Sequence, residues 1–175
     1  MIQLFFIMFS LISKRTTELT SEEIIKICKL KDTFWRFGSQ IQKKWFKKTI
    51  FKNDIHNMFF KGNDLIGYTC LRIRKYNKHK KYLIFDTLII HKKFRKKRYS
   101  SNLMNFNNII IESKKMMAFL ICDKNLVSFY KKFGWILFKD KNSKIIDHKK
   151  AKVSMSLNIN KLKNFKNHIK NWIKD

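Results

Sequence analysis

Hydrophobic residues recur with a helical period in two segments near the start of the chain. Residues 19–32 begin with threonine and serine as candidate caps, continue with two glutamates, and then present an apolar stripe. Residues 39–50 place Ile41, Trp45 and Phe46 on one helical face. The spacing therefore predicts two consecutive helices.

A change to strand-like patterns follows these helices. Residues 55–61 and 65–76 are strand-like and flank the turn sequence Gly-Asn-Asp, which predicts a hairpin. Residues 82–90 form an almost continuous apolar run that Asp86 interrupts. Such a run is typical of a central strand that is covered on both faces.

Helices and strands alternate in the rest of the chain. A wide apolar face predicts a helix over 100–114, and a shorter helix over 124–133 ends at Gly134, a natural residue after a helix. Further strands are predicted over 116–122, 135–139 and 151–159. The order predicts an α/β (α+β) fold around a single twisted sheet.

Both termini are unusual. The apolar residues 1–13 are too few to span a bilayer, which needs about 20 residues, and they have no signal-peptide pattern. We therefore expect a core strand there, with a membrane anchor as the alternative. Residues 161–175 predict a basic amphipathic helix, packed on or extending a domain of residues 1–160. Its lysines form a solvated face or, alternatively, a membrane or nucleic-acid surface.

Composition adds a strong positive charge. The 175 residues carry a formal net charge of +28, which favours non-specific binding to polyanions. Only six of the 40 basic residues are arginines, so specific base recognition is less favoured. Cys28, Cys70 and Cys122 lie far apart, which predicts no metal site and a reducing, cytoplasmic location.

A basic loop separates the predicted central strand from the helix 100–114. The first turn of a helix has unpaired N–H groups and a positive dipole end, which together favour an anion. Ser100 and Ser101 are candidate caps of this helix. The loop is thus either a phosphate-binding site or a solvated basic turn.

Residues 86–104, "DTLIIHKKFRKKRYSSNLM", resemble the corresponding strand, loop and helix of the GNAT superfamily of acyltransferases. The pyrophosphate loop of that family is written Q/R-x-x-G-x-G/A, and Arg95 occupies its first position. Arg98 and Ser100 stand at the two glycine positions. The resemblance implies a single-domain GNAT-like fold with a mixed, mostly antiparallel sheet flanked by helices.

Residues 119–135, "FLICDKNLVSFYKKFGW", carry a second block that is similar to the family, in which Phe129, Tyr130, Gly134 and Trp135 match. The resemblance implies that Tyr130 lies near the CoA sulfur and acts as general acid for the thiolate. Without the resemblance, a Phe-Tyr pair on a helix indicates core packing.

The resemblance also implies a set of groups that bind the acyl donor through the loop, the strand before it and the second block. These are Leu88, Ile89, Ile90, Arg95, Lys96, Lys97, Arg98, Tyr99, Ser100, Ser101, Asn125 and Phe129.

Asp86 is the first candidate for the base. We expect burial in an apolar strand to raise its pKa, although a structural carboxylate is the equal alternative. His91 and His56 are weaker candidates for the base. Trp45, Asp54 and His56 are candidate acceptor-binding residues, with core packing as the alternative.

The resemblance therefore implies an acyl-CoA-dependent N-acyltransferase that moves an acetyl group from acetyl-CoA to a primary amine by direct transfer. We expect a monomer or homodimer with no transmembrane span. The alternatives are a catalytically degenerate GNAT-like binding module and a basic nucleic-acid-binding protein.

Overall fold

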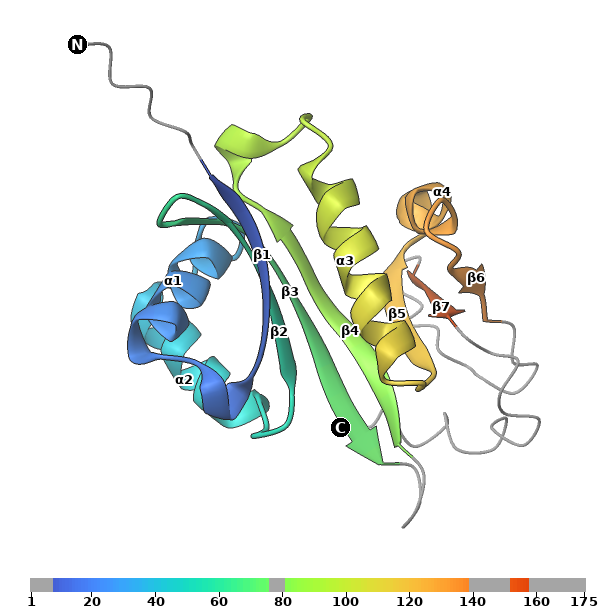
Figure 1. Cartoon of the computed structure of the whole chain (residues 1–175), viewed down its shortest axis with the longest axis horizontal. Helices are drawn as coiled ribbons and strands as arrows, with labels where there is room; N and C mark the ends of the chain where they lie inside the picture. The colour runs from blue at the N-terminus through green and yellow to red at the C-terminus, as the bar shows by residue number, and fades with distance from the viewer. Residues whose placement is uncertain (1–7, 76–80, 139–151, 158–175) are drawn as a thin grey trace. The chain divides into compact units, whose positions relative to one another are not determined.

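The computed structural model describes residues 8–75, 81–138 and 152–157, and it contains a seven-stranded sheet with four helices in this part (Figure 1). The strands are β1 (Phe9–Arg15), β2 (Ile55–Lys61), β3 (Asp64–Lys75), β4 (Lys81–Ile90), β5 (Ala118–Asp123), β6 (Ile136–Leu137) and β7 (Lys152–Leu157). The helices are α1 (Ser21–Asp32), α2 (Ser39–Thr49), α3 (Tyr99–Ser113) and α4 (Val127–Lys131), and short 3-10 turns lie at Thr16–Glu18, Lys92–Phe94 and Lys124–Leu126.

The strand order is β1-β2-β3-β4-β5-β7-β6, so β4 is the central strand, as predicted. The pairs β1·β2, β2·β3, β5·β7 and β6·β7 are antiparallel, whereas β4·β5 is parallel. The predicted mixed, mostly antiparallel α/β fold is therefore confirmed.

Two compact units divide the chain. The first comprises the residues up to Arg72 together with Thr87–Asn107, and the second comprises Ile73–Asp86 together with the residues from Asn108 onward. Strands β3 and β4 and helix α3 contribute residues to both units.

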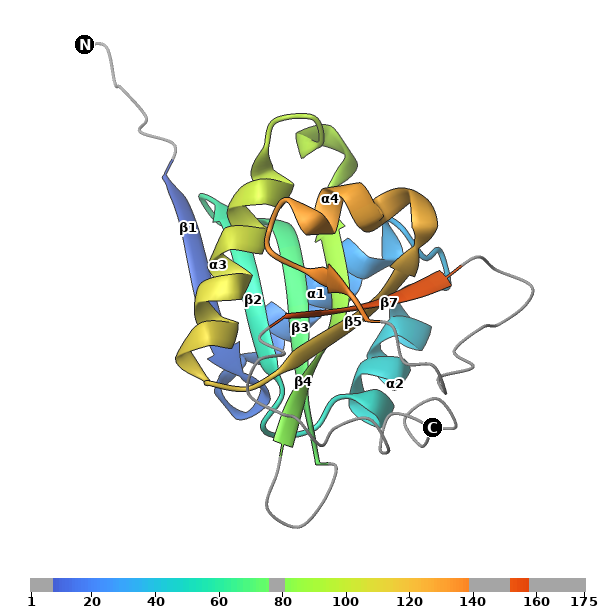
Figure 2. The same ribbon diagram turned by 90° about the vertical axis from the view of Figure 1, so that its right-hand side faces the viewer.

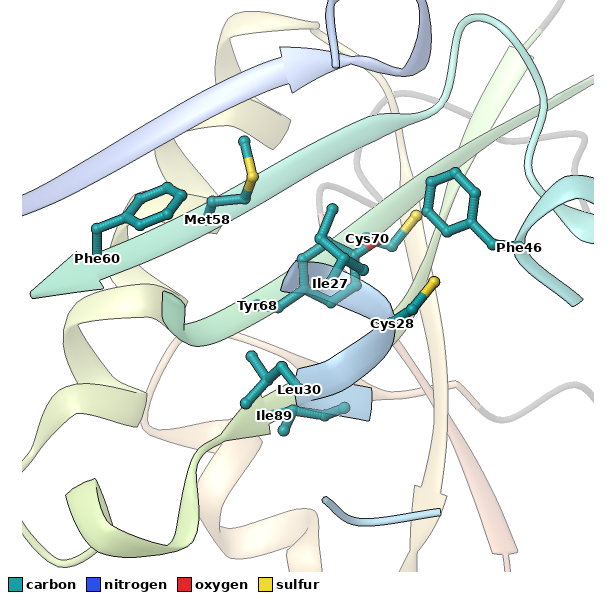
Figure 3. Packing of buried hydrophobic residues seen from close by; sticks show 9 residues of the cluster. All are labelled: Ile27, Cys28, Leu30, Phe46, Met58, Phe60, Tyr68, Cys70 and Ile89. Carbon is teal, nitrogen blue, oxygen red and sulfur yellow. The ribbon is translucent and has the colours of Figure 1, made fainter. Parts of the chain in front are cut away.

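In the first unit, apolar residues cover both faces of the strands. Helices α1 and α2 lie on one side of β1, β2 and β3 (Figure 1). A cluster of Ile27, Cys28, Leu30, Phe46, Met58, Phe60, Tyr68, Cys70 and Ile89 fills that side (Figure 3). A second cluster contains Phe59, Ile66, Ile90 and Leu103, the last from the first half of α3. Because neighbouring residues of β4 join different clusters, this strand is buried on both faces.

Helix α1 begins where the sequence predicted. Thr20 accepts a hydrogen bond from the Glu23 N–H, and the Glu23 carboxylate accepts one from the Thr20 N–H. This reciprocal capping box satisfies two N–H groups that the helix itself cannot pair. Lys14 of β1 forms an ion pair with Glu23, which ties the helix start to the first strand.

The predicted orientation of α2 is wrong in part. Phe46 is buried together with Gln42, whereas Ile41 and Trp45 are exposed. The buried row follows the 42/46 spacing, and the 41/45 row lies about 100° around the helix. Gln42 faces inward because its side-chain amide donates to the Trp35 carbonyl, so a polar residue takes a core position.

A β-bulge interrupts the pairing of β2 with β3, close to the end of β4. The β2·β3 register shifts between Phe59 and Phe60, so Ile66 has no partner residue on β2. The Ile66 carbonyl instead accepts a hydrogen bond from the His91 N–H. The bulge thereby fixes the chain where β4 gives way to the basic loop.

In the second unit, β5, β7 and β6 are neighbouring strands beside α4 (Figure 2). Asn108 of α3 donates to the Phe133 carbonyl and accepts from the Trp135 indole N–H. The predicted strand 135–139 is shorter in the structure, where β6 comprises Ile136–Leu137. Residues 1–7 and the predicted C-terminal helix lie outside the described residues, and the boundary at residue 160 stays a prediction.

The predicted N-terminal strand is confirmed over residues 9–13 and continues to Arg15. Its predicted place in the core is wrong, because β1 is an edge strand of the sheet and none of its residues is fully buried. Among the described residues, no helix is long and apolar enough to cross a membrane. All three cysteines are free thiols and are buried.

His56 belongs to a buried polar network in the first unit. Its Nε2 lies 2.8 Å from the Thr16 hydroxyl, and its Nδ1 lies 2.7 Å from the Tyr68 hydroxyl. The Thr16 hydroxyl proton is directed to the Phe51 carbonyl, so His56 Nε2 must be the donor. Nδ1 is then the acceptor of the Tyr68 proton. Burial, together with the Lys31 charge, lowers the pKa of His56 to about 4.

We predict that this network makes the protein sensitive to acid. The unfolded histidine binds a proton near pH 6.5, whereas the folded one does so only near pH 4. The contribution of His56 to the free energy of unfolding is therefore complete above pH 6.5 and is lost as the pH falls towards 4. The loss attributable to His56 is about 3 kcal/mol. Denaturant titrations at several pH values measure it. The variant His56→Gln should have a flatter profile, and an equal slope in both proteins would contradict the prediction.

Candidate active site

The end of β4 directs its last residues to opposite sides within the first unit. Ile89 joins the cluster below α1 and α2, whereas Leu88 and Ile90 pack in the cluster that includes Leu103. The described register between β4 and β5 comprises only Leu83↔Ala118 and Ile84↔Phe119. The last residues of β4 lie outside this described register, and the predicted use of their backbone groups stays a prediction.

Arg95 braces the loop that follows β4. Its Nε donates to the Ile90 carbonyl at 3.0 Å, and its guanidinium lies 5.7 Å from the centre of the Phe34 ring. Before it, the Phe94 N–H donates to the His91 carbonyl and closes a short turn. One arginine thus links the strand end to the segment between α1 and α2.

The loop has a left-handed backbone at two residues that are not glycine. Lys96 has φ of 62° and Arg98 has φ of 59°. Arg98 stands at the position where the motif has its first glycine, so the glycine conformation is present without glycine. Left-handed geometry costs about 1–2 kcal/mol for an L-residue, and other contacts must offset this cost.

Tyr99 supplies such contacts. Its ring lies 5.4 Å from Phe9 and 5.5 Å from Phe59, measured between centroids, and it packs against the cluster that includes Leu103. Phe94 packs against the same cluster, with the Lys61 ammonium over its ring. These residues hold both ends of the loop against the core.

Helix α3 begins at Tyr99, one residue earlier than predicted. Arg98 is therefore the cap position, and the prediction that Ser100 and Ser101 cap the helix is wrong. The Arg98 carbonyl accepts from the Ser101 and Asn102 N–H groups. Within the described part of the chain, no hydrogen bond is donated by the N–H groups of residues 96–100. These N–H groups, beside four exposed cations at 95–98, form a site suited to phosphate.

His91 lies just before this loop and is half-buried. Its Nδ1 accepts a hydrogen bond from the Lys93 N–H. Partial burial, and then the positive charges of Lys93, Lys92 and Arg95, lower the pKa of His91. The imidazole is therefore neutral near pH 7 and has the chemistry of a proton acceptor.

The second unit contains Tyr130 on the short helix α4. The side chain is 7% exposed and its ring meets Phe85 edge-on at 6.1 Å. Burial, and then the nearby Cys122, raises the pKa of Tyr130 to about 12. The hydroxyl therefore keeps its proton throughout the physiological range and acts as a hydrogen-bond donor.

The turn after α4 depends on glycine. Gly134 has φ of 79°, and its N–H donates to the Lys131 carbonyl. Trp135 is buried and packs against Phe85. Gly134 and Trp135, which match the second motif block, thus have structural roles in this unit. Phe129 is half-buried against Phe133, and Asn125 is exposed before α4.

The expected burial of Asp86 is wrong. This residue is exposed, although Tyr82 and Ile90 on the same face of β4 are buried, so the cover of that face is open at Asp86. The argument from burial therefore does not apply, and the role of Asp86 as a base stays a prediction.

The three predicted acceptor-binding residues divide into exposed and buried ones. Trp45 is exposed and stacks on Phe37 at 5.8 Å. Asp54 and His56 are both fully buried, and the Asp54 carboxylate accepts from the Phe51 N–H. The structure brings Asp54 and His56 into the core of the first unit, and their binding role stays a prediction.

Sequence reasoning missed two features of the site. The left-handed conformation of Lys96 has no signal in the sequence, because lysine rarely adopts it. The contact of Arg95 with Phe34 joins segments far apart in the chain. No group of three or more metal-ligating side chains occurs among the described residues.

Solved structures share this fold. An acyl-CoA N-acyltransferase from Pseudomonas aeruginosa matches with a TM-score of 0.67 and 14% identity, over 85% of this chain and 99% of that chain. The ribosomal-protein-S18-alanine N-acetyltransferase from Escherichia coli matches with a TM-score of 0.64 and 9% identity, over 86% and 93%. The PaiA N-acetyltransferase from Thermoplasma acidophilum, solved with coenzyme A, matches at 0.56 and 15%, over 84% and 98%. The molecule thus has the fold of N-acyltransferases.

The sequence comparison gives the family. The model of the acetyltransferase (GNAT) domain matches residues 16–157. Since this match covers most of the chain, the protein belongs to the GNAT acetyltransferase family, as the two motif blocks predicted. The chain has no match among curated protein sequences.

We predict that Arg98→Gly stabilises the protein by about 1 kcal/mol, because glycine adopts the left-handed conformation without steric cost. Denaturant unfolding measures the change. Lys115→Gly is a matched control, since Lys115 also has a positive φ of 52°. Lys97→Gly, at a residue without positive φ, should instead lower stability. A loss at Arg98 as large as that at Lys97 would contradict the prediction.

Proposed function

We propose that the protein is an acyl-CoA-dependent N-acyltransferase that transfers an acetyl group from acetyl-CoA to a primary amine. The observation that carries the proposal is the loop before α3. It keeps a glycine-like backbone at Arg98 and presents N–H groups without partners among the described residues. Strain of this kind is concentrated at functional sites.

In this proposal the loop binds the pyrophosphate of the donor. The N–H groups of residues 96–100 donate to phosphate oxygens at the positive end of α3. Lys96, Lys97 and Arg98 add positive charge, whereas Arg95 mainly holds the loop to Ile90. The backbone of Leu88–Ile90 polarises the thioester carbonyl, and Asn125 and Phe129 contact the donor.

Direct transfer forms a C–N bond and breaks the C–S bond. The acceptor amine must first be neutral, so a group on the enzyme takes its proton. His91 and Asp86 are the two proposed proton acceptors. The lowered pKa of His91 leaves its ring neutral at pH 7, and Asp86 is an accessible carboxylate.

Tyr130 is proposed to act on the departing sulfur. A thiol has a pKa of about 8.5, well below the value of about 12 for Tyr130, so complete proton transfer to the thiolate would be unfavourable. We therefore assign Tyr130 to donate a hydrogen bond to the developing thiolate. This contribution is electrostatic and does not require the tyrosine to ionise. The nitrogen gives up its remaining extra proton as the amide forms, and that proton neutralises the thiolate of the released CoA.

A second function remains as the alternative: a GNAT-like binding module without catalysis. The observation that favours it is the replacement of both motif glycines by Arg98 and Ser100. Binding of acetyl-CoA without turnover of any amine would support this alternative.

We predict that acetyl-CoA raises the melting temperature, because a ligand that binds only the folded state stabilises it. At a ligand concentration about 100 times Kd, the free energy of unfolding rises by about 2.7 kcal/mol. The measurement is a thermal melt at 150 mM salt. ATP and pyrophosphate serve as controls for charge alone, given the net charge of +28. Equal shifts with all three ligands would contradict a specific donor site.

A variant sharpens this test. Ser101→Asp adds a carboxylate in the first turn of α3, which favours the helix but repels phosphate. We expect normal or higher stability and a smaller shift with acetyl-CoA. Ser39→Asp adds the same charge in the first turn of α2 and should leave the shift unchanged.

We predict that Tyr130→Phe lowers kcat by roughly a hundredfold and leaves the Kd of acetyl-CoA nearly unchanged, because the hydroxyl acts on the departing thiolate. Release of free thiol with a panel of amines measures kcat. Tyr82→Phe, another buried tyrosine of the second unit, is the control. Unchanged turnover in Tyr130→Phe would remove this residue from the mechanism.

A further inference from the structure

The segment from the end of α1 into α2 exposes an unusual group of large apolar side chains, which we call the aromatic face. Phe34, Phe37 and Trp45 are 56%, 51% and 55% exposed, and Trp35 and Ile41 are also exposed. A fixed connection normally buries such residues, because exposing them costs hydrophobic free energy. Several exposed apolar residues within one short segment indicate a binding surface.

The rings of the aromatic face are ordered in pairs. Phe37 and Trp45 are stacked with centroids 5.8 Å apart, and Phe34 meets Trp35 edge-on at 5.0 Å. Two cations lie over these rings. The Lys31 ammonium is 6.0 Å from the centre of Trp35, and the Arg95 guanidinium is 5.7 Å from that of Phe34. Flat apolar surfaces and positive charges thus alternate.

The connection that presents these rings is held by hydrogen bonds. The Gln42 side chain donates to the Trp35 carbonyl at 2.8 Å. The Gly38 N–H donates to the Asp32 carboxylate at 2.8 Å, and the Trp35 N–H donates to the Lys31 carbonyl. The rings therefore project from a braced turn, so little ordering entropy remains to be lost when they bind.

The charge around the aromatic face is almost entirely positive. Asp32 is the sole acidic residue between positions 31 and 53, and its carboxylate accepts from Gly38. The cations of this segment are Lys31, Arg36, Lys43, Lys44, Lys47, Lys48 and Lys52. A positive rim around exposed rings is complementary to a partner that is both anionic and flat.

Charge also disfavours two candidate partners, the C-terminal segment of this chain and a second copy of the chain. The C-terminal segment 161–175 is itself rich in lysine, so it would be repelled. A second copy of the chain would bring the same positive segment to the same surface. An anionic partner from outside is the one that fits.

We propose that the aromatic face binds a single-stranded polynucleotide, with unpaired bases stacked on the rings and lysines beside the phosphates. Exposed bases stack on aromatic side chains without regard to sequence, and basic residues follow the backbone. An anionic membrane is the competing partner. It is less favoured because a membrane-inserting face is normally a continuous apolar stripe, whereas cations lie over these rings. The proposal does not depend on the proposed acyl transfer.

The test uses the full-length protein and fluorescein-labelled 15-nucleotide U and dT oligomers at 50 to 300 mM salt, with fluorescence anisotropy as the readout. A 15-base-pair duplex and vesicles of phosphatidylserine and phosphatidylcholine are the competing probes. We expect both single strands to bind more tightly than the duplex and to quench tryptophan fluorescence. The relative affinity of U and dT distinguishes RNA from DNA as the source.

Two kinds of variant separate stacking from charge. The double variant Phe37→Ser/Trp45→Ser should weaken single-strand binding at least about tenfold with an unchanged salt slope. Lys44→Ala/Lys47→Ala should instead reduce the slope of log K against log salt by about 1.4. Lys114→Ala/Lys115→Ala, which removes two exposed charges at the end of α3, is the charge control, and Ile109→Ser is the exposed apolar control.

Several results would overturn the proposal. These are equal affinity for duplex and single strand, loss of binding in the control variants as great as in the aromatic variant, and binding to vesicles but not to oligonucleotides. If the aromatic variant does not fold, the duplex comparison and tryptophan quenching in the unmodified protein still decide the question.

Discussion

The double burial of β4 is the constraint on which the first unit depends. Ile89 packs among residues from α1 and α2, and Ile90 packs beside Leu103 of α3. A strand with two apolar faces is stable only when both are covered, so helices are required on each side. The basic loop continues directly from this strand, and the packing of β4 therefore fixes where the N–H groups of residues 96–100 lie.

The loop itself shows how packing supports an unfavourable backbone. Lys96 and Arg98 adopt left-handed conformations without glycine, at a cost that neighbouring contacts offset. Arg95 bonds back to Ile90, and Tyr99 packs against Phe59. A loop fixed in this way would lose little conformational entropy on binding an anion, as proposed for the acyl donor.

The groups that surround the basic residues decide which ligand each part of the surface favours. Near α3 the cations stand beside backbone N–H groups, an arrangement that favours phosphate. Near α2 they stand beside exposed rings such as Trp45, an arrangement that favours stacked bases. The net charge of +28 alone distinguishes neither case, because its long-range field is not specific.

The sequence by itself determined the order of elements, the central strand and the two motif blocks, because these depend on local periodicity and capping. Thr20 and Glu23 form the expected capping box, and Gly134 follows the expected short helix. Only the tertiary structure decided which face of α2 is buried, that Asp86 is exposed, and that α3 begins at Tyr99. It also decided that Arg98 keeps a glycine-like backbone. These features depend on contacts beyond the periodicity of a single element, such as the side chain of Gln42 with the Trp35 carbonyl, seven residues away, and Tyr99 with the distant Phe59. No helical or strand pattern encodes such contacts.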